Sequence, residues 1–305
     1  MSDSPHRWLE LSGTVERGGV EAAEDGLLAA GALSVTLADA ADAPVLEPGP
    51  GETPLWPRVT VTGLFDAARD PLEIIAALSA AVPEVDWALR SVADREWTRE
   101  WMRDFRPMRF GERLWVVPSG MAPPENGVVV RLDPGLAFGT GTHPTTALCL
   151  EWLDGLARTP PGLAGKRVLD YGTGSGVLAV AALRLGAERA VAVDNDPQAL
   201  LATRENARAN GVAERIEACT PAEARRALDG RKPDLLVANI LAGVLARLAP
   251  EFAALVAPRG RIALSGILAG QEAPVQDAFR PWFDMGATAS RSGWLRLDGR
   301  RTEDG

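Results

Sequence analysis

Residues 168–176 read VLDYGTGSG, an apolar run that ends in an aspartate and leads into three glycines separated by single residues. A short apolar run followed by glycines predicts a buried strand and then a sharp turn, where a ligand can approach the backbone without meeting a Cβ. A helix is predicted directly afterwards, over residues 176–185. A dinucleotide-binding fingerprint would place its third glycine at position 177, which is occupied by Val177.

This strand, turn and helix begin a long alternating series. We predict strands over residues 167–170, 190–194, 216–219, 234–239 and 261–264, helices over 176–185, 197–210, 242–256 and 271–282, and two short final strands over 287–290 and 294–297. Apolar strands that alternate with helices predict a mostly parallel sheet covered on both faces, and such sheets bind ligands at the carboxyl ends of their strands. We therefore expect an α/β, Rossmann-like domain with seven strands.

An acidic residue closes the second of these strands. Asp194 lies 22 residues after Gly172, where a carboxylate can accept hydrogen bonds from ribose hydroxyls. A glycine turn chosen only for packing would explain Gly172, Gly174 and Gly176 but not the acid at the next strand end. Together with Asp170, this pattern resembles the class I, S-adenosylmethionine-dependent methyltransferases more closely than the nicotinamide enzymes.

The fourth strand ends in the sequence DLLVANIL, residues 234–241. Asn239 resembles the asparagine of the Asn-Pro-Pro-aromatic motif of amino-group methyltransferases, whose side chain accepts hydrogen bonds from the target nitrogen. Ile240 and Leu241 stand in place of the prolines, and Ala242 stands in place of the aromatic residue. Without a ring for stacking, an aliphatic amine is favoured over adenine or glutamine as the acceptor. The alternative is that Asn239 only caps the strand end.

The N-terminal third has a different organisation and a different charge. Strands over 6–16, 34–37, 58–64 and 86–92, with helices over 19–30 and 71–81, fit a small ferredoxin-like α+β domain. Residues 1–95 hold 16 acidic and 6 basic side chains, whereas the rest of the chain holds 25 acidic and 26 basic ones. This charge argues against direct binding of nucleic acid. It suits either a basic protein partner or an acidic surface that maintains solubility.

Between the two domains we predict a linker helix over residues 96–110. Trp97, Trp101 and Phe105 recur every four residues, which places them on one face of a helix. We interpret this stripe as packing against a domain, since acidic residues alternate with the arginines that a nucleic-acid platform would need. The predicted domains are residues 1–95, for substrate recognition, and residues 111–305, for catalysis.

Residues 132–146, LDPGLAFGTGTHPTT, form a glycine-rich stretch ahead of a helix, and predict a mobile loop with Thr142 as the cap before Pro144. This loop, the Asn239–Gly243 strand end and the segment 97–110 together resemble the ribosomal protein L11 methyltransferase family over essentially the whole chain. The family normally has Cys where this sequence has Thr173, and the change should be tolerated because the backbone does the binding.

The resemblance implies transfer of methyl groups from S-adenosylmethionine to lysine side chains or the N-terminal amine of ribosomal protein L11, a basic substrate. It implies Asn239 as the catalytic residue. The cofactor contacts that follow from matching positions are Thr146, Gly172, Gly174, Asp194 and Asn239, with Phe138 and His143 on the closing loop. His143 is a candidate either for proton transfer or for loop structure and cofactor contact. The alternatives are an RNA-base methyltransferase and a module that binds the cofactor without turnover.

The cysteines and the apolar runs of the sequence indicate where the protein acts. Cys149 and Cys219 have apolar neighbours, so we expect neither a disulfide framework nor a catalytic thiol. The apolar runs are shorter than the ~18 residues needed to span a membrane, and the first ten residues lack the apolar stretch of a signal peptide. We expect a cytoplasmic monomer without a metal site.

Overall fold

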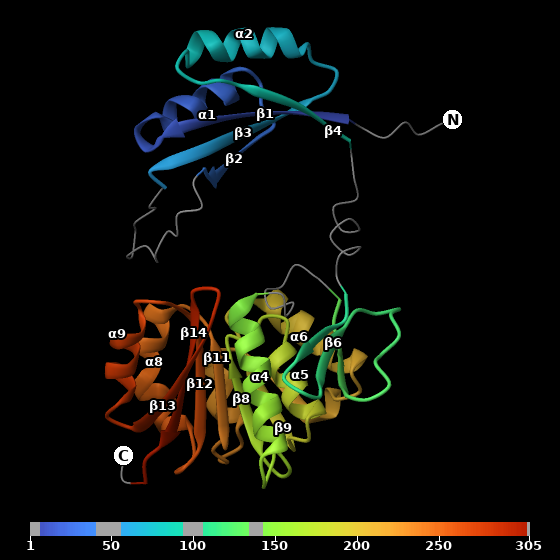
Figure 1. Cartoon of the computed structure of the whole chain (residues 1–305), viewed down its shortest axis with the longest axis vertical. Helices are drawn as coiled ribbons and strands as arrows, with labels where there is room; N and C mark the ends of the chain where they lie inside the picture. The colour runs from blue at the N-terminus through green and yellow to red at the C-terminus, as the bar shows by residue number, and fades with distance from the viewer. Residues whose placement is uncertain (1–6, 41–55, 94–105, 134–142, 304–305) are drawn as a thin grey trace. The chain divides into compact units, whose positions relative to one another are not determined.

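The computed structural model describes residues 7–40, 56–93, 106–133 and 143–303. The chain divides into two compact units, Met1–Trp101 and Met102–Gly305 (Figure 1). Each unit has a buried core of its own. No helix in the described ranges is both long enough and apolar enough to cross a membrane.

The first unit is an antiparallel sheet with two helices. Along the chain its elements are β1 (Arg7–Glu16), α1 (Val20–Ala29), β2 (Ser34–Asp39), β3 (Arg58–Asp66), α2 (Pro71–Ala81) and β4 (Ala88–Ala93). The four strands lie in the order β2-β3-β1-β4, and each neighbouring pair is antiparallel. The predicted order of strand, helix, strand, strand, helix and strand is confirmed.

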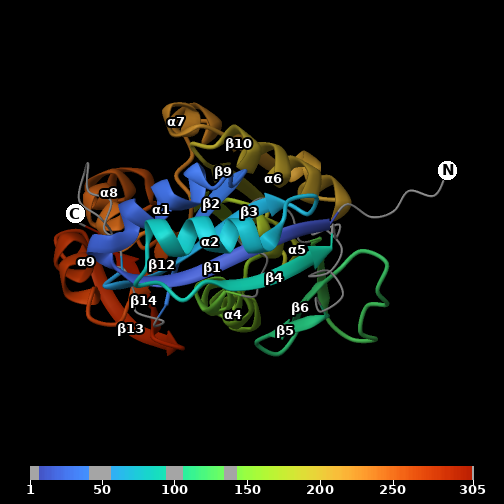
Figure 2. The same cartoon turned by 90° about the horizontal axis from the view of Figure 1, so that it is seen from above.

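One face of this sheet packs against both helices. Leu11 and Phe65 from the strands are fully buried in one cluster with Leu27 and Leu78 from the helices. The two helices lie side by side on that face (Figure 1, Figure 2). The alternation of buried and exposed side chains along β3 is the pattern expected of a strand that is covered on one side.

The second unit is built on a seven-stranded sheet of order β10-β9-β8-β11-β12-β14-β13. Its strands are β8 (Arg167–Tyr171), β9 (Arg189–Val193), β10 (Ile216–Cys219), β11 (Leu235–Asn239), β12 (Arg261–Leu268), β13 (Phe283–Arg291) and β14 (Trp294–Arg301). Neighbouring strands from β10 to β12 are parallel, whereas β14 is antiparallel to both β12 and β13. The sheet is therefore mixed, and β14 is one of its inner strands.

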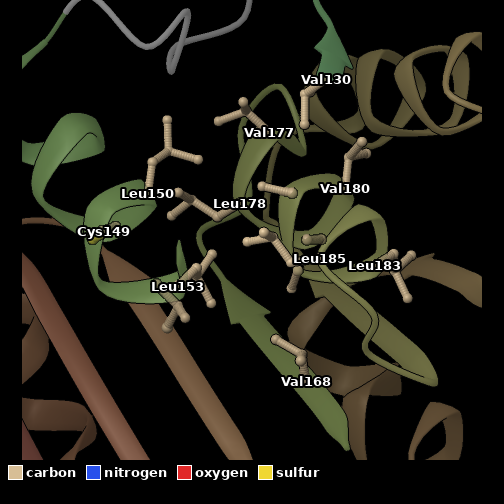
Figure 3. Close-up of a cluster of buried hydrophobic side chains, with 14 of the residues drawn as sticks. Val130, Cys149, Leu150, Leu153, Val168, Val177, Leu178, Val180, Leu183 and Leu185 are labelled. Atoms are coloured by element: carbon tan, nitrogen blue, oxygen red, sulfur yellow. The ribbon is translucent and has the colours of Figure 1, made fainter. Parts of the chain in front are cut away.

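Helices cover both faces of this sheet. They are α4 (Pro144–Arg158), α5 (Val177–Arg184), α6 (Pro197–Ala209), α7 (Ala224–Ala227), α8 (Ala242–Leu255) and α9 (Glu272–Phe279). Val168 of β8 packs with Leu150 of α4 and Val180 of α5 in one core (Figure 3). The next residue of the same strand, Leu169, packs with Phe252 of α8 in the other core. Successive residues of a strand point to opposite faces, and both faces are covered, which explains why these strands are mainly apolar.

A small third sheet precedes α4 and was not predicted. Its strands are β5 (Met108–Phe110), β6 (Leu114–Val117) and β7 (Val128–Arg131). The prediction of a helix over 96–110 is therefore wrong for its last five residues: Arg106 and Pro107 are not helical, and residues 108–110 form a strand in which the exposed Arg109 precedes the buried Phe110. Residues 96–105, which hold Trp97, Trp101 and Phe105, lie outside the described ranges.

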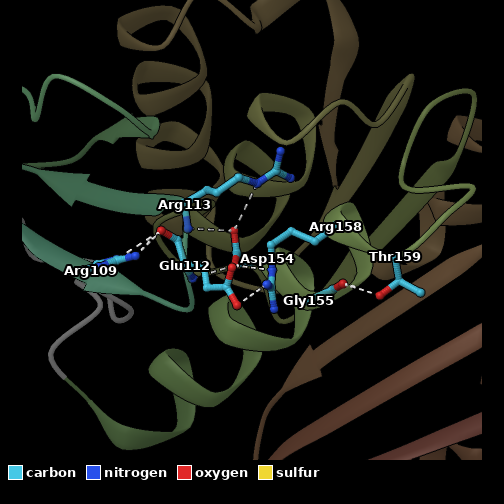
Figure 4. Close-up of polar contacts among 7 residues, drawn as sticks. All are labelled: Arg109, Glu112, Arg113, Asp154, Gly155, Arg158 and Thr159. Carbon is cyan, nitrogen blue, oxygen red and sulfur yellow. Dashed lines mark hydrogen bonds and ion pairs between the residues drawn. The ribbon is translucent and has the colours of Figure 1, made fainter.

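Asp154 attaches this small sheet to α4 (Figure 4). Its side chain is fully buried, and its carboxylate accepts hydrogen bonds from the backbone N–H groups of Glu112 (2.8 Å) and Arg113 (3.3 Å). The same carboxylate forms ion pairs with Arg158 Nε (3.3 Å) and Arg113 Nε (4.0 Å). Gly111 has φ 68° and lies so close that a Cβ there would overlap the carboxylate. The turn between β5 and β6 is thus fixed to the helix by a buried charge.

Candidate functional site

A cavity of about 730 Å³ opens at the carboxyl ends of β8, β9 and β11. The first turns of α4 and α8 and the tip of the β13–β14 hairpin complete its wall. Among the described residues its lining consists of His143, Thr145, Tyr171, Gly172, Gly174, Val193, Asp194, Asn195, Pro221, Asn239, Ile240, Leu241, Val244, Leu248, Gly266 and Trp294. The strand ends are where the predicted sheet was expected to bind its ligand.

A second cavity, of about 670 Å³, lies at the amino ends of β8, β11 and β12. Lys166 and Asp234 line it and pair with each other at 2.8 Å, and Arg261 and Asp284 add further charges of both signs. None of the glycines of the 172–176 turn borders it. The chemistry suggested by the sequence therefore belongs to the first cavity.

The glycine turn after β8 has a backbone that only glycine adopts without strain. Gly172, Gly174 and Gly176 have φ values of 78°, 54° and 78°. The N–H groups of Gly172 and Thr173 both donate to the Val193 carbonyl, at 2.8 and 3.0 Å. A Cβ at Gly172 would overlap the Ile240 side chain. The turn is therefore held between β9 and the end of β11, with its backbone on the cavity wall.

Asp194 links the ends of β8 and β9. Its Oδ2 accepts a hydrogen bond from Gly174 N at 2.9 Å, and its Oδ1 accepts one from Asp196 N at 3.0 Å. Each carboxylate oxygen has a further lone pair. The side chain lines the cavity in a fixed orientation and retains acceptor capacity for the hydroxyls of a ligand.

Asp170 lies beneath the turn and is fully buried. Its Oδ2 accepts hydrogen bonds from Thr173 Oγ1 (2.7 Å) and Ala179 N (3.1 Å), whereas its buried Oδ1 has no hydrogen-bond partner among the described residues. Burial raises the pKa of this carboxyl to about 6, and the two hydrogen bonds only partly oppose that effect. Asp170 thus takes up a proton more readily in the folded protein than in the unfolded chain.

This raised pKa predicts a pH-dependent stability difference between the wild type and Asp170→Asn. Because the folded pKa of about 6 lies above the unfolded value near 4, the folded state binds the proton more tightly, and the contribution of Asp170 to stability decreases between about pH 4 and pH 6. Relative to wild type, Asp170→Asn should gain about 3 kcal/mol of unfolding free energy across that range. Urea unfolding at several pH values measures this difference. Exposed Asp229→Asn is the control, and parallel curves for Asp170→Asn and wild type would contradict the assignment.

Asn239, at the end of β11, is oriented by α4. Its Nδ2 donates to the hydroxyl of Thr146 at 3.2 Å, and Thr146 is buried behind it. Because the amide nitrogen is used in this contact, the amide oxygen Oδ1 is the group left to accept a hydrogen bond on the cavity side. Thr146 thus positions Asn239 and does not itself line the cavity.

His143 caps α4. The helix begins at Pro144, so the cap is His143 and not Thr142 as predicted, because a proline in the first helical position puts the cap immediately before it. The N–H of Thr145 donates to His143 Nδ1 at 3.4 Å, and the Thr145 hydroxyl lies 2.7 Å from the same nitrogen. Burial lowers the pKa of His143. A neutral ring whose Nδ1 accepts a hydrogen bond carries its proton on Nε2. This arrangement favours a role of His143 in loop structure over a role in proton transfer.

The structure brings five of the seven predicted site residues to one cavity: His143, Gly172, Gly174, Asp194 and Asn239. Thr146 lies behind Asn239, and Phe138 falls outside the described residues. Sequence reasoning missed Tyr171 and Trp294, which also line the cavity. Burial and the nearby Glu251 raise the pKa of Tyr171 to about 12, so it is no proton acceptor at neutral pH.

Within the described ranges, no group of His, Cys, Asp or Glu side chains is placed to hold a metal ion.

The mixed sheet, the glycine turn after its first parallel strand and the cavity at the strand ends define a methyltransferase of the α/β class. The chain belongs to the ribosomal protein L11 methyltransferase family. The family model described as "Ribosomal protein L11 methyltransferase (PrmA)" matches residues 7–302.

Individual relatives agree with this membership. The ribosomal protein L11 methyltransferase of Pseudomonas paraeruginosa is 52% identical over 303 residues, which cover 97% of this chain and 99% of the relative. The protein of the same name from Chromohalobacter salexigens is 52% identical over 305 residues, with coverage of 96% and 98%. A crystal structure of the ribosomal protein L11 methylase from Lactobacillus delbrueckii subsp. bulgaricus is 31% identical with a TM-score of 0.56, and covers 65% of this chain and 100% of that one.

Proposed function

We propose that this chain transfers methyl groups from S-adenosylmethionine to amino groups, on lysine side chains or the N-terminus, of ribosomal protein L11. The observation that carries the proposal is that the glycine turn, Asp194 and Asn239 line one cavity. The names of the relatives supply the substrate. The geometry supplies a place for a nucleoside next to a hydrogen-bond acceptor for an amine.

The residues present fit S-adenosylmethionine. Gly172 and Gly174 line the cavity with backbone in the left-handed region, a Cβ at Gly172 would overlap Ile240, and Asp194 has free lone pairs for ribose hydroxyls. When bound, this cofactor supplies an electrophilic methyl group on a sulfonium. We propose Gly172, Gly174 and Asp194 as direct contacts, and Phe138 and His143 as the loop side of the site.

The protein residues must orient a neutral amine. Deprotonation at pH 7 costs roughly 4.6 kcal/mol for a lysine of pKa ~10.4 and about 1 kcal/mol for an N-terminus of pKa ~7.8. Holding two reactants in line is worth ~7 to 11 kcal/mol, which offsets either cost. The apolar side chains of Ile240, Leu241 and Val244 would lower the pKa of an amine beside them, because they replace part of the water that stabilises its charged form. Asn239 Oδ1 would accept a hydrogen bond from the amine and so direct its lone pair away from the amide.

We also propose that residues 1–95 form a ferredoxin-like domain that recognises the substrate, and that residues 111–305 form the catalytic domain. The strand order β2-β3-β1-β4 with both helices on one face supports the first assignment. Glu21, Asp25 and Glu73 are exposed on those helices, which suits a basic ribosomal protein better than RNA. With a ribosomal protein as substrate, we expect the enzyme to act in the cytoplasm. We also expect it to be a monomer and not to bind nucleic acid directly.

The test is transfer of labelled methyl groups from S-adenosylmethionine to dissociated ribosomal components, followed by mass mapping. We expect label on amino groups of ribosomal protein L11 alone. Label in RNA would identify an RNA-base methyltransferase instead. Tight cofactor binding without any transfer would identify a module that binds the cofactor without turnover.

Gly172→Ala is expected to lower the affinity for S-adenosylmethionine by at least about tenfold, because a Cβ in this left-handed turn would overlap Ile240 and force the cavity wall to move. Calorimetric titration with the cofactor measures the change. Gly120→Ala is the matched control, because Gly120 has φ 81° but nothing within 4 Å of a Cβ. Equal affinities for Gly172→Ala and Gly120→Ala would show that the turn does not touch the cofactor.

A further inference from the structure

Trp294 stands at the tip of the last hairpin and borders the cavity. It begins β14 directly after Ser292 and Gly293, whose φ values of 49° and 78° make the tight turn. Its ring meets the His143 ring edge-on, with the centroids 4.9 Å apart and the planes at 69°. The side chain is half-buried and belongs to none of the buried core clusters. A large aromatic residue is thus placed on a cavity wall where core packing does not require it.

The hairpin tip is held from two sides. Arg291 pairs with Glu151 of α4 at 2.7 Å. The N–H of Ala269, just after β12, donates to the Gly293 carbonyl at 2.9 Å. The position of the Trp294 ring is therefore fixed by the same helix whose first turn orients Asn239.

Trp294 and Asn239 contact neighbouring residues of that first turn. Asn239 donates to Thr146, Thr145 contacts the His143 ring, and the His143 ring packs against Trp294. Both end residues of this chain of contacts line the cavity. The cavity therefore has an amide acceptor on one side of the α4 terminus and an indole on the other.

The sequence motif at β11 lacks the aromatic residue that amino-group methyltransferases place after their asparagine. Ala242 occupies that position and is buried in the core beneath α8. Among the described lining residues the rings belong to His143, Tyr171 and Trp294, and the Tyr171 ring packs on Phe252 at 5.0 Å. Among the described lining residues, the indole is therefore the aromatic surface that remains available to an incoming side chain.

We propose that Trp294 determines acceptor specificity: its indole packs against the aliphatic part of the acceptor beside the target nitrogen. This inference rests on the proposed methyl transfer to amino groups. Apolar contact of this kind favours a long alkyl amine, such as a lysine side chain, because each methylene group that leaves water stabilises the complex. The proposed direct cofactor contacts, Gly172, Gly174 and Asp194, follow β8 and β9, so the loss of the Trp294 indole should affect the acceptor more than the cofactor.

The test compares full-length Trp294→Leu, Trp294→Met and Trp294→Phe in steady-state methyl transfer to ribosomal protein L11, with the dissociation constant for S-adenosylmethionine measured on each. We expect the leucine and methionine variants to raise the KM for the protein about tenfold and to leave cofactor affinity within about twofold. Phenylalanine should restore most of the loss, because it retains a ring. Trp115→Leu, on β6 and away from the cavity, is the control.

The outcomes test the role of Trp294 separately from the proposed methyl transfer. Wild-type transfer with an unchanged KM in both apolar variants would overturn the role of Trp294 and leave the proposed function intact. A parallel loss of cofactor affinity would also overturn it, since the residue would then only hold the fold. No transfer by the wild type would overturn both proposals. Because Trp294→Leu and Trp294→Met differ in shape, the role of Trp294 can still be tested if one of the two variants fails to fold.

Discussion

Asn239→Ala is expected to lower kcat for methyl transfer by about two to three orders of magnitude, the usual cost of removing one preorganised polar group at a reacting centre. Asn239 Oδ1 is the acceptor that directs the amine, and its orientation depends on the 3.2 Å contact with Thr146. Cofactor affinity should change only a few-fold, because the glycine turn and Asp194 remain. Single-turnover kinetics with labelled cofactor and a separate binding titration distinguish the two effects.

Two further variants sharpen this prediction. Thr146→Val keeps the shape of the residue but removes the hydroxyl that holds Asn239, so we expect a smaller loss, of about tenfold in kcat. Asn126→Ala, on the exposed surface, should match the wild type. An Asn239→Ala enzyme with wild-type kcat would mean that the asparagine is a strand-end cap without a part in the reaction.

Asp154→Ala is expected to lower the unfolding free energy by about 3 kcal/mol, since two backbone N–H groups lose a charged acceptor. For a unit of this size the melting temperature should fall by roughly 6 to 12 °C. The ion pairs add little to this figure, because Arg113 and Arg158 are partly exposed and regain water. Thermal unfolding followed by circular dichroism measures the shift.

The controls for Asp154 come from the same residue and the same helix. Asp154→Asn retains one acceptor oxygen and should lose about half as much stability. Glu151→Ala removes only the partly exposed ion pair with Arg291, so its cost should stay within about 1 kcal/mol. Equal effects of Asp154→Ala and Glu151→Ala would show that the buried carboxylate does not hold the small sheet in place.

The sequence predicted the large sheet well because its signals are local. Short, mainly apolar segments marked β8, β9 and β10, and the helices between them followed from spacing and capping residues. Errors fell at boundaries. The helix predicted over 271–282 ends at Phe279, because Pro281 has no N–H for a further helical hydrogen bond. The extent of β13 was missed since its register with β14 shifts between Met285 and Thr288.

The features that sequence reasoning missed depend on contacts between distant parts of the chain. Strand β5 has three residues and is recognisable only through its partner β6 and through Asp154, more than forty positions away. Trp294 reaches the cavity because its hairpin is tied to α4, and nothing in the adjacent sequence signals this. By contrast, Gly172, Asp194 and Asn239 could be named in advance, because each lies at the carboxyl end of a predicted parallel strand and these ends share one edge of the sheet.

The position of β14 has a consequence for how the enzyme is made. A chain grows from its N-terminus at about 5 to 20 residues per second, and its domains fold as they emerge. β14 is the last strand along the described chain, yet it separates β12 from β13. Until it is synthesised, β12 is an unprotected edge open to pairing with another chain, and β13 has no place in the sheet. A premature stop after Arg291 would therefore release an aggregation-prone fragment rather than a slightly shortened enzyme.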